Sequence, residues 1–204
     1  MSAVDLSSYA GLTAMALLTL NILLGLLISM RYSPVRRWPH RRIPIFDIHN
    51  WTAYIALFLV FLHPVLLLFS STAHFHWIDV LWPINSPGQQ TYNWLGALAL
   101  YSVTFVVVTS YFRLSIGRRA WKAFHYVAYA AAGLLYVHGT LIDPNLKNLP
   151  PDLLDGEKVF VEVCFFLVIA GSIVRLRYGL NKETPQRHVV LSARELEVES
   201  ASAE

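Results

Sequence analysis

Four histidines are the residues of this sequence best suited to chemistry. His49 and His63 lie in one long apolar segment, and His125 and His138 lie in another. Ionisable side chains inside apolar segments of membrane length are costly and are candidates for function. One such histidine could serve a hydrogen bond between helices. Two on each of two segments favour a shared role, such as binding a metal or a cofactor.

The spacing of the histidines converts into depth along a helix. His63 follows His49 by fourteen residues, which is about 21 Å at the helical rise per residue. His138 follows His125 by thirteen residues, or about 19.5 Å. Two histidines this far apart on one helix cannot bind the same metal ion. Across two helices that run in the same direction, depth pairs His49 with His125 and His63 with His138.

A porphyrin fits between such pairs, because haem iron accepts axial imidazoles and bundle cores hold cofactors between facing helices. Zinc is the alternative metal, but two histidines leave its coordination incomplete, and Asp47 is the only nearby carboxylate. A flat macrocycle also needs small neighbours. Alanines follow both of the first histidines at helical spacing: Ala53, Ala56, Ala128 and Ala132.

The fourteen- and thirteen-residue spacings place the second histidine at different angles around its helix. At about 100° per residue, His63 lies roughly 40° from the face of His49, whereas His138 lies roughly 140° from the face of His125. Either the two cofactors are offset or the second helix is distorted, with Gly133 as a candidate position. Pro64 can bend the first helix.

The elements that position these residues are membrane spans. The chain has 204 residues, of which 55% are hydrophobic and only 14% are charged, against about 25% charged in soluble domains. A span needs roughly 20 mostly apolar residues. Five segments qualify: 6–30, 48–71, 92–112, 123–142 and 159–174. The predicted fold is an all-α, polytopic membrane helix bundle with the histidines on helices two and four.

The Lys and Arg residues predict the orientation of the bundle. Thirteen of the sixteen lie at 31–42, 113–122 and 175–187, after the first, third and fifth spans, and the positive-inside rule makes that side cytoplasmic. The N-terminus is then outside and the C-terminus inside. We expect contact with membrane lipid and no binding of nucleic acid. Residues 1–178 form the membrane domain, and residues 179–204 form a short, partly disordered cytoplasmic tail.

Haem propionates are anions, so cations near each pocket are candidate partners. On the cytoplasmic side these candidates are Arg42, Arg118, Arg119 and Lys122. On the outer side they are Lys147, Lys158, His74 and His76. No residue is assigned a catalytic role.

Two stretches resemble the haem-binding helices of the ferric-reductase-like transmembrane superfamily. One is HNWTAY at 49–54 with His63 and Pro64, and the other is RAWKAFHY at 119–126 with His138. The superfamily includes ferric reductases, the membrane part of NADPH oxidases and the haem-binding subunit of the periplasmic methionine sulfoxide reductase system. The resemblance covers residues 42–175 and implies two b-type haems, each held by a histidine pair.

The resemblance has two departures. The superfamily often has six spans, whereas five are expected here. Many members also carry a flavin and nicotinamide domain, for which the short tail has no room and no Gly-rich phosphate loop. The expectation is therefore an electron-transfer subunit of a bacterial inner-membrane oxidoreductase, not a self-contained NAD(P)H enzyme. A separate cytoplasmic flavoprotein would supply electrons for an acceptor on the outer side.

Two other functions stay open on sequence grounds. Bis-histidine ligation leaves no free position on iron for a substrate, which favours electron transfer. A quinone-linked or haem-sensing membrane subunit is the first alternative. A non-haem bundle whose histidines carry protons or a transported metal is the second.

Overall fold

The computed structural model describes the backbone of residues 2–31, 44–143 and 150–201, and the side chains of these segments as far as residue 181. Within these residues all regular structure is helical. The elements are α1 (Ala3–Ser29), α2 (Ile45–Leu67), α3 (Trp77–Leu81), η2 (Pro83–Asn85), α4 (Gln90–Tyr111), α5 (Arg113–Ile116), α6 (Arg118–His125), α7 (Val127–Leu141) and α8 (Gly156–Ala201).

Four helices are long and apolar enough to cross a membrane. They are α1, α2, α4 and the Gly156–Asn181 part of α8. Large apolar side chains such as Trp51 and Phe58 are more than 60% exposed, as expected of a surface that faces lipid. The chain is therefore an integral membrane protein, and the predicted all-helical membrane bundle is confirmed.

The expected span at 123–142 is not one continuous helix. It is divided into α6 and α7 at Tyr126, whose N–H donates to the carbonyl of Ala123, three residues back, at 3.2 Å. The break follows His125 directly and interrupts the register between His125 and His138. Gly133, the position considered from sequence, lies inside α7, and α2 continues through Pro64. The number of spans remains a prediction, because this pair adds no single long helix to the four.

The packing of the long helices closes a ring. The α1 helix packs along α2 and against α8, α8 packs against α7, α7 against α4, and α4 against α2. The α2 and α7 helices face each other across the ring and are not among its closely packed pairs. Space is therefore left between the two helices that carry the histidines.

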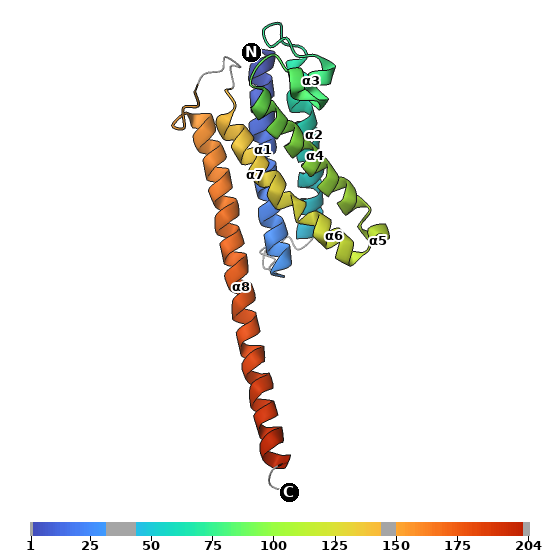
Figure 1. The fold of residues 1–204 in the computed structure, drawn as a ribbon, viewed down its shortest axis with the longest axis vertical. Helices are drawn as coiled ribbons and strands as arrows, with labels where there is room; N and C mark the ends of the chain where they lie inside the picture. Colours follow the sequence, from blue (N-terminus) through green and yellow to red (C-terminus); the bar gives the residue numbers. More distant parts are fainter. Residues whose placement is uncertain (1, 32–43, 144–149, 202–204) are drawn as a thin grey trace.

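The α8 helix extends well beyond the bundle and ends near the C-terminus (Figure 1). It has 46 residues and runs without interruption past residue 178. The division into a membrane domain at 1–178 and a tail at 179–204 stays a prediction.

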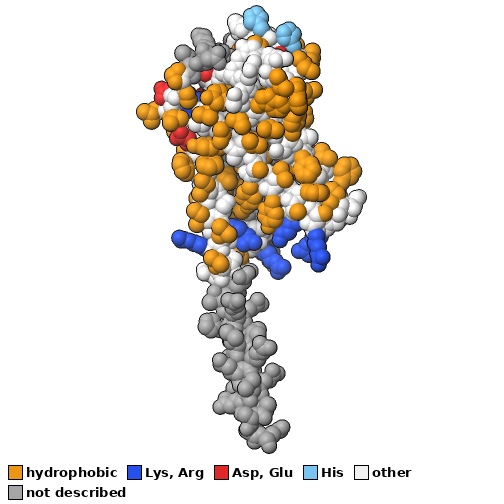
Figure 2. All heavy atoms as spheres, in the orientation of Figure 1, with side chains coloured by type: hydrophobic (Ala, Val, Ile, Leu, Met, Phe, Trp, Pro, Cys, Tyr) orange, Lys and Arg blue, Asp and Glu red, His pale blue; other side chains and the backbone are white. Residues whose placement is uncertain are grey.

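Charged side chains gather at opposite ends of the bundle (Figure 2). We call one end the basic end: among the residues whose side chains are described, it holds seven of eight Lys and Arg, with Lys158 the exception. The seven are Arg31, Arg113, Arg118, Arg119, Lys122, Arg175 and Arg177. The opposite, acidic end holds Asp79, Asp143 and Glu157. This separation has the pattern of the positive-inside rule.

Candidate cofactor site

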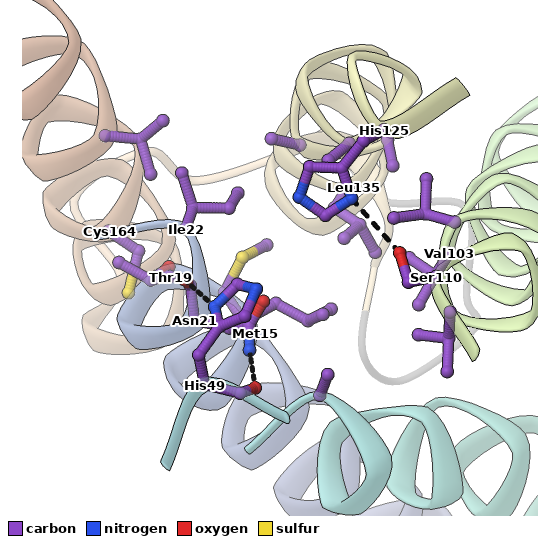
Figure 3. Close-up of a pocket in the computed structure, with 18 of the residues that line it drawn as sticks. Met15, Thr19, Asn21, Ile22, His49, Val103, Ser110, His125, Leu135 and Cys164 are labelled. Atoms are coloured by element: carbon purple, nitrogen blue, oxygen red, sulfur yellow. Dashed lines mark hydrogen bonds between the residues drawn. The ribbon is translucent and has the colours of Figure 1, made fainter. Parts of the chain in front are cut away.

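The four histidines face one another in two pairs. The ring centres of His49 and His125 are 6.2 Å apart, and those of His63 and His138 are 6.3 Å apart. Figure 3 shows His49 of α2 and His125 of α6 pointing into one pocket from opposite sides. The structure thus brings together the same pairs that depth along the helices predicts.

Each pair borders its own pocket. The basic-end pocket is bordered by His49 and His125, and the acidic-end pocket by His63 and His138; with space open to solvent included, they measure about 890 and 1290 Å³. Of the expected small neighbours, Ala53, Ala128 and Ala132 line the basic-end pocket. Ala56 is fully buried elsewhere in the packing.

The separation within each pair matches two imidazoles on opposite sides of one metal ion. A bound imidazole nitrogen lies about 2.0–2.1 Å from the metal and ~1.1 Å from its own ring centre, so two opposed rings have centres ~6.3 Å apart. Within the described residues, no group of three or more His, Cys, Asp or Glu is placed to hold a metal ion. The donor set therefore fits a metal whose other positions are filled by a macrocycle better than it fits protein-bound zinc.

The Nδ1 atom of every histidine in the two pairs has a hydrogen-bond partner. His49 donates to the carbonyl of Asn21 at 3.0 Å, His63 to that of Ser7 at 2.7 Å, and His138 to that of Tyr92 at 2.8 Å. His125 lies 3.2 Å from the Ser110 hydroxyl. A carbonyl can only accept, so Nδ1 carries the proton in the first three. The lone pair of Nε2 is then free to bind a metal, as in other sites where a second partner fixes the histidine.

The α1 helix holds both histidines of α2 in the same way. The Ser7 hydroxyl donates to the backbone carbonyl of His63 at 2.8 Å, and the Asn21 side-chain amide donates to the backbone carbonyl of His49. Each α1 residue thus accepts from the imidazole and donates to the backbone of the same histidine. We refer to these two arrangements as the α1 clamps.

Sequence reasoning missed the clamp residues, although a signal was present. Ser7 and Asn21 are polar residues in an apolar helix, and they are fourteen residues apart, as are His49 and His63. Matching intervals on two antiparallel neighbours indicate paired contacts. The hydroxyl of Ser110 was also missed; it accepts from Trp121 at 3.3 Å as well as lying beside His125.

The basic residues of α6 that were expected near the propionates lie outside both pockets. Arg118, Arg119 and Lys122 are exposed on α6 and do not border either pocket. Arg42 and Lys147 fall outside the described residues. Of the outer candidates, Lys158 borders the acidic-end pocket, where its ammonium donates to the carbonyls of Gly139 and Ile142. The other two, His74 and His76, are exposed. Propionate contacts therefore remain predictions.

A model of the ferric reductase like transmembrane component family matches residues 10–136. The chain belongs to this family. The resemblance noted in the sequence is thus confirmed, and the family generally binds haem and works with a redox partner. Searches of curated proteins and of solved structures found no match.

The extent of the family match adds two observations. The match begins inside α1, so this helix belongs to the family region. The resemblance seen in the sequence covered only residues 42–175. The match includes His49, His63 and His125 and ends two residues before His138. The role of His138 therefore rests on its position opposite His63.

Proposed function

We propose that this chain carries electrons across the membrane through two b-type haems. The observation that carries the proposal is the pair of ring separations, 6.2 and 6.3 Å, at the two ends of one apolar bundle. His49 and His125 would hold the haem at the basic end, and His63 and His138 the haem at the acidic end. Bound haem supplies one-electron chemistry, and with both axial positions taken by imidazole it leaves no site for a substrate on iron.

The protein's part is to hold four neutral imidazoles in fixed orientation and to keep water away. Carbonyl and hydroxyl partners at Nδ1 direct each Nε2 toward the pocket. Apolar side chains such as Leu18, Val103 and Phe165 line the basic-end pocket. An apolar surrounding tunes a redox centre by limiting solvent access.

The two pockets meet at a thin apolar partition. Met15 of α1 and Leu135 of α7 line both pockets. Beside them, Ala14, Val60 and Leu100 form a buried cluster. Shared apolar lining supports direct electron transfer between the two proposed haems.

The direction of transfer follows from the charge of the two ends. The basic end would face the cytoplasm under the positive-inside rule and would offer a docking surface to an acidic flavoprotein that oxidises NAD(P)H. Complementary charge mainly accelerates such an encounter. The acceptor, a small molecule or a protein, would then meet the acidic end outside a bacterial inner membrane. The quinone-linked, haem-sensing and transporter alternatives gain no specific support from the geometry.

An absorption spectrum of the purified full-length protein tests this proposal. Made in cells supplied with haem, the protein should show the sharp reduced bands of low-spin, bis-imidazole b-type haem and contain two haems per chain. His76→Ala, at a histidine that is 81% exposed, is the matched control and should keep both haems. Protein that folds but contains zinc or no cofactor would refute the proposal.

A further inference from the structure

Three glycines lie against three of the pocket histidines. A Cβ at Gly96 would come within 2.8 Å of Cε1 and 3.0 Å of Nδ1 of His138. A Cβ at Gly11 would lie 3.0 Å from Nδ1 of His63, and one at Gly25 would lie 3.3 Å from Cε1 of His49. Only the 2.8 Å contact at Gly96 is closer than real Cβ atoms come to other atoms. At Gly11 and Gly25 an added Cβ would push the imidazole aside by a few tenths of an ångström.

Each of these glycines lies four residues after another residue of its helix, and the backbone carbonyl of that residue accepts the hydrogen bond from Nδ1 of the adjacent histidine. The pairs are Ser7 with Gly11, Asn21 with Gly25, and Tyr92 with Gly96. In an α-helix the carbonyl of residue i−4 accepts from the N–H of residue i, and a second lone pair remains. The Cα–Cβ bond of residue i is tilted toward the helix N-terminus and covers the preceding turn. Without a Cβ, that lone pair becomes accessible to a donor from the neighbouring helix.

We propose that Gly11, Gly25 and Gly96 are positioning residues that open one backbone carbonyl each to the Nδ1–H of a pocket histidine. They fix the protonation site and the orientation of the ring, and so set the strength of the metal-binding nitrogen. A hydrogen bond from Nδ1 to a carbonyl raises the basicity of a histidine ligand. The same arrangement occurs three times on two helices, so chance packing of small residues does not account for it.

The fourth histidine has a different partner. Ser110 lies on α4 beside His125, fourteen residues after Gly96, which lies beside His138. Its hydroxyl is 3.2 Å from Nδ1 of His125. The same hydroxyl accepts from the Trp121 indole. An oxygen that already accepts one N–H is a weaker acceptor for a second. We therefore infer that the Nδ1 hydrogen bond of His125 is weaker than those of the other three histidines, and that His125 is the weaker metal ligand.

Alanine substitutions at the three glycines test this inference. The ring N–H resonances of the pocket histidines are measured by ¹⁵N NMR in reduced, full-length protein, assigned with single histidine variants. Wild-type protein should show strongly hydrogen-bonded Nδ1–H resonances for His49, His63 and His138. Gly96→Ala and Gly11→Ala should each lose that shift for the facing histidine, and Gly25→Ala, with its longer contact, should show a smaller loss.

Two matched glycines separate this effect from general crowding. A Cβ at Gly171 would lie 2.9 Å from Cδ2 of Leu23, with no histidine nearby, and a Cβ at Gly133 would meet nothing within 4 Å. Alanine at either position should leave all four histidine resonances unchanged. Ser7→Ala removes a hydroxyl that lies 3.0 Å from Nδ1 of His63 but keeps the carbonyl at 2.7 Å, so most of the Nδ1–H shift of His63 should remain.

A second readout uses bound haem and rests on the proposed function. Loss of a partner behind a metal-binding histidine typically lowers metal affinity about 10- to 100-fold. Gly96→Ala should therefore lower the affinity for the acidic-end haem by about 10- to 100-fold. The reduction potential of any haem retained should rise. Gly171→Ala should change neither quantity.

The two readouts distinguish the possible failures. If the protein binds no haem, the proposed function fails, while the ring N–H resonances still test the glycines. If Gly96→Ala and Gly11→Ala leave these resonances unchanged, or if Gly171→Ala alters them equally, the inference is wrong. Should Gly96→Ala fail to fold, the milder Gly25→Ala decides the question through His49.

Discussion

Ser7 and His63 exchange two hydrogen bonds. The imidazole Nδ1 of His63 donates to the backbone carbonyl of Ser7 at 2.7 Å, and the Ser7 hydroxyl donates to the backbone carbonyl of His63 at 2.8 Å. A short polar residue near the start of the first helix thus fixes a ring and its backbone on the second. The contact is fully inside the bundle, because Ser7 is only 2% exposed.

Ser7→Ala should destabilise the protein without releasing the haem. It removes the buried hydrogen bond to the His63 carbonyl, for which a net loss of about 1 kcal/mol is typical, and also the contact of 3.0 Å between the Ser7 hydroxyl and Nδ1 of His63. The carbonyl that holds the imidazole remains. Thermal unfolding in detergent should show a lower Tm, while the haem content stays at the wild-type value. Ser172→Ala, which removes a hydroxyl bonded only within its own helix, is the control.

Alanine at the histidines should reveal which of them share a haem. His49→Ala and His125→Ala should damage the same haem, and the double variant should resemble the singles, because groups that act as one unit are not additive. His49→Ala combined with His138→Ala should lose both haems. Haem content and redox titration measure these outcomes. Loss of only one haem in the cross-pair variant would contradict the pairing.

The two rings of each pair are strongly inclined to one another. The interplanar angle is 63° for His49 and His125 and 76° for His63 and His138. Axial imidazoles with crossed planes leave the iron d orbitals nearly degenerate. The oxidised protein should therefore give strongly anisotropic low-spin EPR signals for both haems. A compact rhombic signal would show that the rings turn parallel when haem binds.

Ser110 offers a test of the rule that a small residue exposes the carbonyl four positions earlier. Ser110→Ala should deprive His125 of its hydrogen bond and weaken the basic-end haem. Ser110→Gly should preserve an Nδ1–H bond, because it exposes the carbonyl of Val106, for which the Thr109 hydroxyl at 3.2 Å is then a competing donor. Ring N–H resonances and haem content distinguish the two variants. Equal loss in both would limit the rule to the other three histidines.

Reporter fusions test the orientation. If the basic end faces the cytoplasm, as the positive-inside rule predicts, Gly117 lies in the cytoplasm and Asn85 lies outside. A periplasm-active reporter should therefore work at Asn85 and at Asn148 and fail at Gly117 and at the C-terminus. A cytoplasmic Asn148 would overturn both the five-span topology and the common direction of the two histidine helices.

Much of this arrangement could be predicted from sequence because it depends on length and interval. Apolar segments of membrane length indicated α1, α2, α4 and α8, and depth alone placed His49 opposite His125. The break at Tyr126 carries no comparable signal, since neither Pro nor Gly stands there. With this break, His125 and His138 both face histidines of α2.

The partners of the histidines were harder to predict for a physical reason. The amino-acid sequence does not show which backbone carbonyls can accept a second hydrogen bond. Here that capacity depends on the absence of a side chain four residues later. Gly11, Gly25 and Gly96 resemble ordinary small residues of helix packing until the imidazoles are in place. The roles of Arg118, Arg119 and Lys122 remain predictions, because these exposed residues border neither pocket.

Ser7 and Asn21 on α1 are separated by as many residues as His49 and His63 on α2, so the spacing along the first helix must match the spacing along the second. Both α1 clamps must engage at once, so the number of residues between Ser7 and Asn21 is as constrained as their identities. One residue inserted between them would shift one clamp by about 1.5 Å and rotate it by about 100°. Substitutions along this stretch can be absorbed locally, whereas a single insertion or deletion would disengage one of the two histidines from α1.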